Sequence, residues 1–303
     1  MSNPTEIILQ ILHGSFIIYL GIALGFVFMK LPLKKYRKLF VDFTINIITP
    51  LLIFFSIVRL NHASFWFVPI IGGLIITGIG LAFPIFISKV KDLSDPDPAE
   101  LCTSTFPNAL NFPFPIIFAL SPNALGAASI FLATTVVMRN TVGLYISGVK
   151  MDRANIIEII KFPPIIGIIA GFVYKLIYHQ DTISHNTPVD WLFQIGIIMT
   201  LMTVGFGLKR PNLNYKIPIL RVSLSRFVIS GIFAFLLIFT LPINRDMSIA
   251  LFVQMIAPPA VYNGLYAERF NLDTELTSQI IIAVTMIALL ILPFELLLLQ
   301  TIF

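Results

Sequence analysis

Two clusters of prolines with asparagines beside them are the part of this sequence best suited to bind a ligand. The first holds Pro107, Pro113 and Pro115, and the second holds Pro258 and Pro259. Proline lacks a backbone N–H and clashes with the preceding helical turn, so each cluster frees backbone groups where it interrupts a helix. Half-helix N-termini and neutral side-chain amides can then face an anion without the cost of burying a full charge. The clusters predict an anion-binding site.

The elements that must position these clusters are long apolar segments. The chain has 303 residues, of which 57% are hydrophobic and 12% are charged, against about 25% charged residues in a soluble domain. About 20 apolar residues cross a bilayer as a helix. Eight uninterrupted segments of that order lie at 7–28, 39–60, 64–88, 123–147, 155–178, 188–208, 217–242 and 277–302, and the proline clusters interrupt two more, at 99–121 and 247–268. We predict an all-α polytopic membrane protein with ten transmembrane helices.

The lysines and arginines between these segments fall into two alternating sets of loops. One set holds thirteen of them: Lys30, Lys34, Lys35, Arg37, Lys38, Lys89, Lys91, Lys150, Arg153, Lys209, Arg210, Lys216 and Arg269. The opposite set holds three, namely Arg59, Lys175 and Arg245. Cytoplasmic loops are enriched in Lys and Arg, so we expect a multi-pass protein of the cell membrane with both termini outside. The net charge of +5 then belongs to loops, and a nucleic-acid partner is not expected.

The two interrupted segments are the fourth and ninth of the ten, which makes each the fourth helix of a five-helix half. Pro107 and Pro258 are 151 residues apart, and the string Gly-Ile-Ala-Leu-Gly-Phe at 21–26 is similar to Gly-Ile-Ile-Ala-Gly-Phe at 167–172. Because five is an odd number, the second half enters the membrane from the opposite side, as in the inverted repeats of secondary transporters. We predict one repeat over 1–150, an inverted repeat over 151–303, and transport by alternating access.

The sequence resembles the auxin efflux carrier family, which includes the plant PIN-FORMED carriers and many short prokaryotic proteins. The resemblance rests on Phe-Pro-Asn-Ala-Leu-Asn-Phe-Pro-Phe-Pro at 106–115 and Ala-Pro-Pro-Ala-Val-Tyr-Asn at 257–263. Pro-Leu-Leu-Ile-Phe at 50–54 and Asn140 also match. The family's motif glycines are replaced by Leu110 and Pro113. The long cytoplasmic loop of plant members is absent, since the corresponding loop covers only 149–155.

This resemblance implies two inverted five-helix halves, a scaffold bundle, and a crossover of the fourth and ninth helices at which substrate binds. It makes four asparagines candidate substrate ligands, and Tyr262 stands within the second motif; the asparagines are Asn108, Asn111, Asn140 and Asn263.

Two arginines, Arg139 and Arg226, lie well inside predicted spans, where an ionisable group is expensive to place. Arg139 lies past the midplane toward the cytoplasm, beside Asn140. It is a candidate ligand for an anion, and the alternative is a structural arginine that extends to the interface. Arg226 lies near the midplane of the eighth span. We expect a structural pairing for it, because that helix would belong to the scaffold.

The other polar residues of the spans are expected to be structural. Asp42 and Glu295 lie near the ends of their spans, and His13 lies in an outer third, so a proton relay at mid-depth is not predicted. Gln194, Gln254 and Gln279 are expected to form hydrogen bonds between helices.

Enzymatic functions lack their sequence motifs. The chain has no His-Glu-x-x-His helix, Gly-x-Ser-x-Gly elbow, Walker A loop or dinucleotide glycine fingerprint. Its single cysteine, Cys102, excludes an internal disulfide and a cysteine metal cage. We therefore expect no enzyme, no metal and no cofactor.

The sequence predicts a secondary transporter of small organic anions, with an elevator-like shift of the crossover bundle. One alternative is a sodium-coupled organic-anion symporter similar to the bile acid carriers. Another is a membrane sensor or channel subunit that binds a ligand without turnover. The expected partners are the anion and the lipid bilayer, and a homodimer is left open.

Overall fold

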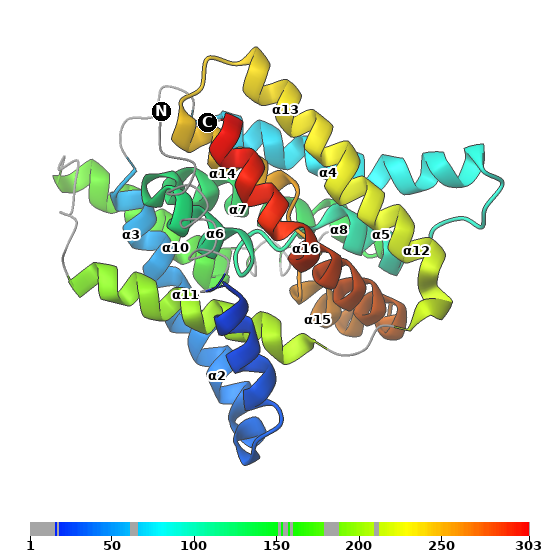
Figure 1. The fold of residues 1–303 in the computed structure, drawn as a ribbon, viewed down its shortest axis with the longest axis horizontal. Helices are drawn as coiled ribbons and strands as arrows, with labels where there is room; N and C mark the ends of the chain where they lie inside the picture. The colour runs from blue at the N-terminus through cyan, green and yellow to red at the C-terminus, as the bar shows by residue number, and fades with distance from the viewer. Residues whose placement is uncertain are drawn as a thin grey trace.

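The computed structural model describes residues 16, 18–60, 66–150, 153, 157, 160–178, 188–208 and 212–302. Within these residues the fold is helical, and the one β-type pairing is an isolated bridge (Figure 1). Six stretches there are long and apolar enough to cross a membrane: Pro32–Val58, Val68–Val90, Pro122–Ile146, Pro188–Gly207, Lys216–Thr240 and Thr274–Leu299. Two shorter apolar helices cover Ile18–Phe28 and Pro163–Tyr178. These eight fall on the eight uninterrupted predicted segments, and the all-helical, multi-pass character is confirmed.

The first half of the described chain contains η1 (Pro32–Tyr36), α2 (Arg37–Phe43), η2 (Thr44–Ile48), α3 (Thr49–Val58), α4 (Val68–Val90), α5 (Pro98–Thr105), α6 (Pro113–Leu120), η3 (Pro122–Ala124), α7 (Leu125–Arg139) and α8 (Val142–Ile146). The second half contains α10 (Pro163–Tyr178), α11 (Pro188–Gly207), η4 (Leu213–Tyr215), α12 (Lys216–Ser223), η5 (Leu224–Ile229), α13 (Ser230–Thr240), α14 (Arg245–Met255), α15 (Tyr262–Arg269) and α16 (Thr274–Ile302).

One group of helices, here called the small bundle, consists of Ile18–Phe28, α2 with its continuation through η2 into α3, α10 and α11. α10 lies along α3, and α11 packs on α3 and η2. Glycines allow these helices to approach closely. A Cβ added at Gly25 would lie 2.1 Å from the Met202 carbonyl oxygen, and one added at Gly205 would lie 2.1 Å from that of Ile22. Such small residues let membrane helices make backbone contacts that a larger side chain would prevent.

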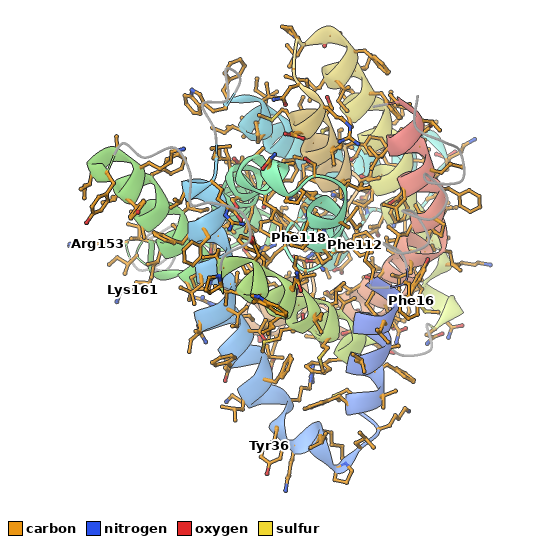
Figure 2. All side chains as sticks on the ribbon, turned by 60° about the vertical axis from the view of Figure 1, so that its left-hand side comes forward. Phe16, Tyr36, Phe112, Phe118, Arg153 and Lys161 are labelled. Carbon is orange, nitrogen blue, oxygen red and sulfur yellow. The ribbon has the colours of Figure 1, made fainter. Side chains whose placement is uncertain are left out.

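The remaining helices, α4 to α8 and α12 to α16, form a second group, here called the large bundle. α7 packs on α4 and α14, and α16 packs on α12 and α5. The two bundles touch where α3 and α10 meet α7 and where α11 meets α6. At the last contact Phe118 of α6 stacks on Phe193 of α11, with ring centroids 5.8 Å apart. In Figure 2, Phe112 and Phe118 lie at the centre of the molecule, whereas Tyr36, Arg153 and Lys161 lie at its edges.

The two segments predicted to be interrupted each consist of two short helices. α5 begins where the Asp97 carboxylate accepts a hydrogen bond from the Ala99 N–H (2.7 Å), and α14 begins where the Asn244 side chain accepts one from Met247 N–H (2.9 Å). Each helix therefore starts with a side-chain cap. They end at Thr105 and Met255, just before the two proline clusters. The prolines prevent either helix from continuing.

Two helices contain π-helical turns. The turn at η2 precedes Pro50, which has no N–H to donate to the preceding turn. The turn at η5 contains Arg226 and has no proline within it. π turns often mark functional positions in helices, and η5 lies within the large bundle against α4 and α13.

Candidate functional site

The two helix interruptions lie directly against one another. Pro107 and Pro259 form an antiparallel bridge. The Asn108 N–H donates to the Pro258 carbonyl oxygen (2.7 Å), and the Ala260 N–H donates to that of Phe106 (3.0 Å). The extended residues 106–108 and 257–260, here called the crossing, thus satisfy backbone groups that the ended helices would leave unpaired. The crossing lies inside the large bundle.

The prolines of the two clusters occupy different places. Pro107, Pro258 and Pro259 lie in the crossing itself. Pro113 and Pro115 lie in the first turn of α6, where proline is favoured because a helix leaves its first N–H groups unpaired. The Phe114 N–H between them already donates to the Leu110 carbonyl (3.1 Å). The N-terminus of α6 therefore offers few backbone donors to an anion.

Asn108 and Asn263 are buried at the crossing, and each keeps one polar atom without a partner. Asn108 is 5% exposed, and its Oδ1 accepts a hydrogen bond from the Asn111 N–H (3.0 Å). Asn263 is 1% exposed, and its Nδ2 donates to the Phe106 carbonyl oxygen (3.0 Å). The Asn108 Nδ2 and the Asn263 Oδ1 have no hydrogen-bond partner. Buried amide groups are normally paired, so these two atoms are suited to bind a ligand.

The other candidate ligands are less enclosed. Asn111 lies in the turn between the crossing and α6 and is partly buried. Asn140 follows the last residue of α7, and its Nδ2 donates to the Val136 carbonyl oxygen of the same helix (2.9 Å). Tyr262 begins α15 and is 37% exposed. Of the amide nitrogens predicted to bind substrate, that of Asn140 is already used within its own helix.

Arg139, the last residue of α7, is 6% exposed and faces aromatic rings. Its guanidinium carbon lies 5.8 Å from the ring centroid of Phe106 and 5.0 Å from that of Tyr262. Phe106 belongs to the crossing, so Arg139 lies beside it. The Arg139 Nε has no hydrogen-bond partner, and no carboxylate among the described residues forms an ion pair with this side chain. The structure thus brings Arg139 and Tyr262 together at the crossing.

Arg226 is fully buried, and its acceptors are backbone carbonyls. Its Nε donates to the Ala257 oxygen (2.9 Å), its Nη2 to that of Met255 (3.2 Å) and its Nη1 to that of Ser104 (3.5 Å). The expected structural pairing is confirmed, with backbone carbonyls as the partners. Its helix packs on α4 and α14 and so belongs to the large bundle with the crossing.

A buried ion pair that sequence reasoning missed links α5 to α12. The Arg221 Nη2 lies 2.6 Å from the Glu100 Oε2, with side-chain exposures of 4% and 1%. The guanidinium also donates to the Ser88 hydroxyl and to the Ser94 carbonyl oxygen (2.8 Å). Both residues lie near the ends of their predicted segments, so their depth in the membrane did not mark them as a buried pair.

The remaining polar predictions have mixed outcomes. Gln254 is buried and donates to the carbonyl oxygens of Ala109 (3.0 Å) and Ala128 (3.3 Å), which confirms an interhelical role. The Gln279 Oε1 accepts from the Asn212 N–H (2.8 Å), while Gln194 is exposed. Asp42 is also exposed. His13 lies outside the described residues.

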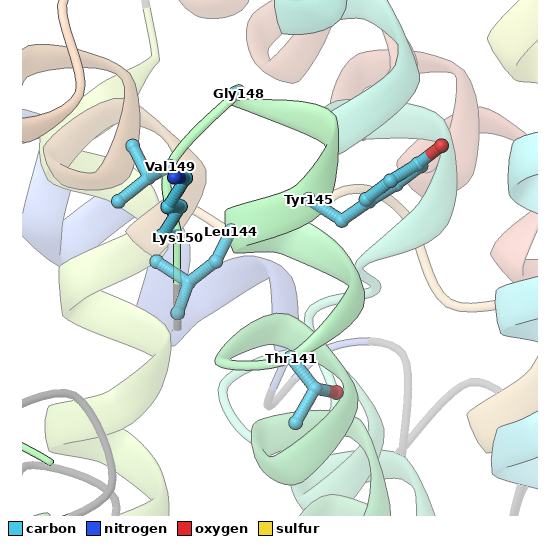
Figure 3. A pocket seen from close by; sticks show the side chains of 6 residues that line it. All are labelled: Thr141, Leu144, Tyr145, Gly148, Val149 and Lys150. Carbon is cyan, nitrogen blue, oxygen red and sulfur yellow. The ribbon is translucent and has the colours of Figure 1, made fainter. Parts of the chain in front are cut away.

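A pocket of about 400 Å³ lies along α8 and the residues that follow it. It is lined by Thr141, Leu144, Tyr145, Gly148, Val149 and Lys150 (Figure 3). Gly148 has a φ of 70°, which a residue with a Cβ rarely adopts. Within the described part of the chain, no three His, Cys, Asp or Glu side chains gather as metal ligands would.

Comparison with known proteins gives one family. Residues 147–296, about half of the chain, match the family described as Membrane transport protein. No curated protein matches the chain. Together with the apolar helices of the fold, this match identifies the chain as a multi-pass membrane transporter, and it belongs to the membrane transport protein family of the auxin efflux carrier type.

Proposed function

We propose that this transporter carries small organic anions, chiefly carboxylates, by alternating access at the crossing. The observation that carries the proposal is Arg139. Burying a cation without a counter-charge costs several kcal/mol, and Arg221 and Arg226 meet this cost with a carboxylate or with three carbonyls. The Arg139 guanidinium is buried against two rings and retains unpaired donor capacity. An anionic substrate would supply the missing partner.

The crossing offers neutral donors beside this charge. The Asn108 amide nitrogen can donate to a second carboxylate oxygen, and the Asn263 oxygen can accept from a substrate hydroxyl or amine. Because two prolines at the start of α6 lack N–H groups, we assign the anion to side chains and not to that helix terminus. Asn111, Asn140 and Tyr262 complete the proposed site at its rim.

The packing of the small bundle supports ten helices in two inverted repeats. In such a fold the first helix corresponds to the sixth, and the second to the seventh. Gly25 of the first helix contacts Met202 of α11, the seventh. Gly167 of α10, the sixth, contacts Pro50 at the start of α3, part of the second. The first helix of each repeat therefore packs on the second helix of the other repeat. In this proposal α5–α6 and α14–α15 are the corresponding interrupted helices, and the repeats meet near residue 150.

We further propose that the large bundle moves against the small bundle in an elevator-like shift. The bundles meet mainly through apolar side chains such as Phe118 and Phe193 and through a hydrogen bond from the Tyr19 hydroxyl to the Leu289 carbonyl oxygen (2.6 Å), whereas the polar contacts of the crossing lie within the large bundle. Sliding along an apolar contact breaks fewer hydrogen bonds than separating the crossing would. The crossing would thus travel as one unit with its substrate.

Counterflow in proteoliposomes tests the proposed function. Vesicles loaded with an unlabelled mono- or dicarboxylate should accumulate the same labelled anion, because a carrier exchanges substrate across the membrane. The substrate is first chosen by its effect on the melting temperature of the purified protein. Binding without counterflow would indicate a sensor or channel subunit, and counterflow that requires Na⁺ would indicate a sodium-coupled symporter.

The proposed orientation has its own test in cells. On a background without Cys102, single cysteines at positions 36 and 152 should react with an impermeant thiol reagent only after the cytoplasmic side is opened. Cysteines at 62 and 183 should react from outside. Labelling of position 36 in intact cells would reverse the orientation derived from the Lys and Arg distribution.

A further inference from the structure

Arg226 lies where the C-terminal ends of two interrupted helices meet. α5 ends at Thr105 and α14 ends at Met255. The three acceptors of its guanidinium are the carbonyl oxygens of Ser104, Met255 and Ala257, all in the last turn of these helices or just beyond it. The side chain is 0% exposed. One guanidinium therefore joins the two sides of the crossing.

The electrostatics of this place favour a cation. The last carbonyls of a helix have no partner within it, and the helix dipole gives that end a partial negative charge. Two such ends brought together in a buried site attract positive charge more strongly than either alone. In membrane transporters, unwound carbonyls and half-helix C-termini coordinate Na⁺. Here a guanidinium, with its fixed fork of N–H donors, bonds to acceptors of the same kind.

The surrounding packing holds this arginine in place. It lies in the π turn η5, where the Ser230 hydroxyl donates to the Ser225 carbonyl oxygen (2.9 Å). The Ser225 hydroxyl is bonded to that of Ser104 (3.1 Å). On the other side α4 approaches so closely that a Cβ at Gly80 would lie 2.4 Å from the Ser104 oxygen. The carbonyls are therefore enclosed with the guanidinium between them.

We propose that Arg226 is a built-in cation of the crossing: it occupies the place that a monovalent metal ion would otherwise take, and it positions the ends of α5 and α14. The crossing then needs no bound Na⁺ to hold its shape, and the chain would operate without sodium coupling at this place. The role of Arg226 as a cation does not depend on which anion is transported.

Melting of the purified full-length protein tests it. Cys102, the single cysteine, is buried, so its reaction with a thiol-reactive coumarin reports unfolding. Melting is compared in equal millimolar concentrations of choline, sodium, potassium and guanidinium chloride. The wild type should melt at the same temperature in all four salts. Arg226→Ala should melt lower in choline, and sodium or guanidinium should restore part of the loss by filling the vacated place.

Three further variants separate charge from size. Arg226→Lys keeps the charge and should melt nearer the wild type than Arg226→Met, which keeps the bulk, and neither should respond to the salts. Gln254→Ala is the matched control, because this neutral, fully buried side chain also donates to two carbonyls. It should melt lower in every salt by the same amount, since neither carbonyl lies at the C-terminal end of a helix, where the dipole would attract a cation.

Several outcomes would overturn the proposal. These are a stabilisation of the wild type by sodium alone, an Arg226→Met variant as stable as the wild type, and an Arg226→Ala variant that no cation raises. Should neither the Ala nor the Met variant fold, the wild type and Arg226→Lys still decide. A Lys variant that also fails to fold would show that shape, and not charge, is required. None of these measurements uses substrate, so a failure of carboxylate transport would leave them unchanged.

Discussion

The two bundles are built on different principles although both are apolar overall. In the small bundle, helices approach through glycines until backbone meets backbone, as at Gly25 and Gly205. In the large bundle, two helices are interrupted, and buried polar groups satisfy the broken ends, as Arg226 and Asn263 do. Interrupted helices expose carbonyl and N–H groups that lipid cannot satisfy. The bundle that holds the crossing therefore needs buried polar partners for its broken helix ends, a need that continuous helices do not have.

The same substitution placed in each bundle gives the largest expected difference. Asn263→Ala and Asn108→Ala should abolish counterflow, because they remove amide groups at the crossing. Melting should change little, because the Phe106 carbonyl oxygen keeps its bond from the Ala260 N–H and the main-chain bonds of the crossing remain. Asn46→Ala is the matched control in the small bundle: this side chain is exposed and donates to the Asp42 carbonyl of its own helix (2.8 Å). It should transport as the wild type does. Loss of folding in both crossing variants, with full activity in the folded remainder, would make these asparagines packing residues.

Ion pairs offer the second comparison. Glu100→Gln leaves Arg221 buried without its counter-charge, and breaking such a pair costs about 3–5 kcal/mol. Asp190→Asn breaks the small-bundle pair with Arg59 (2.7 Å), whose side chains are 9% and 22% exposed, and more exposed pairs contribute about 1 kcal/mol or less. Chemical unfolding of both variants measures the difference. Equal losses of stability would remove the distinction drawn between the bundles.

Glycine packing gives the third. A Cβ at Gly205 would meet the Ile22 carbonyl oxygen, whereas one at Gly207, two residues along the same helix, would meet nothing within 4 Å. Gly205→Ala should lower the free energy of unfolding by about 1–3 kcal/mol, the usual cost of overpacking. Gly207→Ala should leave it almost unchanged. A tolerated Ala at 205 would mean that the first helix and α11 can separate at little cost.

The smallest expected effect concerns affinity at Arg139. Arg139→Lys keeps the charge but loses the planar fork that grips a carboxylate through two parallel hydrogen bonds. Binding of the substrate should weaken by about 1–3 kcal/mol, the scale of hydrogen bonds to charged groups. Titration of the purified protein measures it, with the exposed Arg269→Lys as control. Unchanged affinity in a folded Lys variant would make Arg139 a structural residue.

The sequence was sufficient for the features that depend on local chemistry. Hydrophobic runs placed the eight uninterrupted helices, and the proline clusters placed both interruptions. Proline alone would have misled, because Pro84 and Pro293 lie inside α4 and α16 without ending them. What distinguished the true interruptions was a cluster of prolines beside asparagines. Pro113 and Pro115 nonetheless start α6 and do not break it, a distinction that depends on where the preceding helix ends.

Features that depend on tertiary approach could not be predicted. Arg221 and Glu100 are 121 residues apart, and Arg226 meets carbonyls from two other helices. Backbone acceptors carry no side-chain signature, so the sequence could only say that Arg226 needed some partner. The π turn at η5 contains no proline, so the sequence could not predict it either. The position of Arg139 beside Asn140 is visible in the sequence, whereas its contact with Phe106 and Tyr262 arises only when distant segments meet.

Part of what holds the crossing together is main-chain hydrogen bonding, which does not depend on the identity of the side chains. The bonds from Asn108 N–H to Pro258 and from Ala260 N–H to Phe106 form whatever side chains these four positions carry, apart from proline at the two donors. Substitution around the crossing can therefore alter the shape and polarity of the proposed site while these two bonds persist. Directed evolution toward new cargo should begin at positions 110–111 and 261–262, where substitutions leave both main-chain bonds in place.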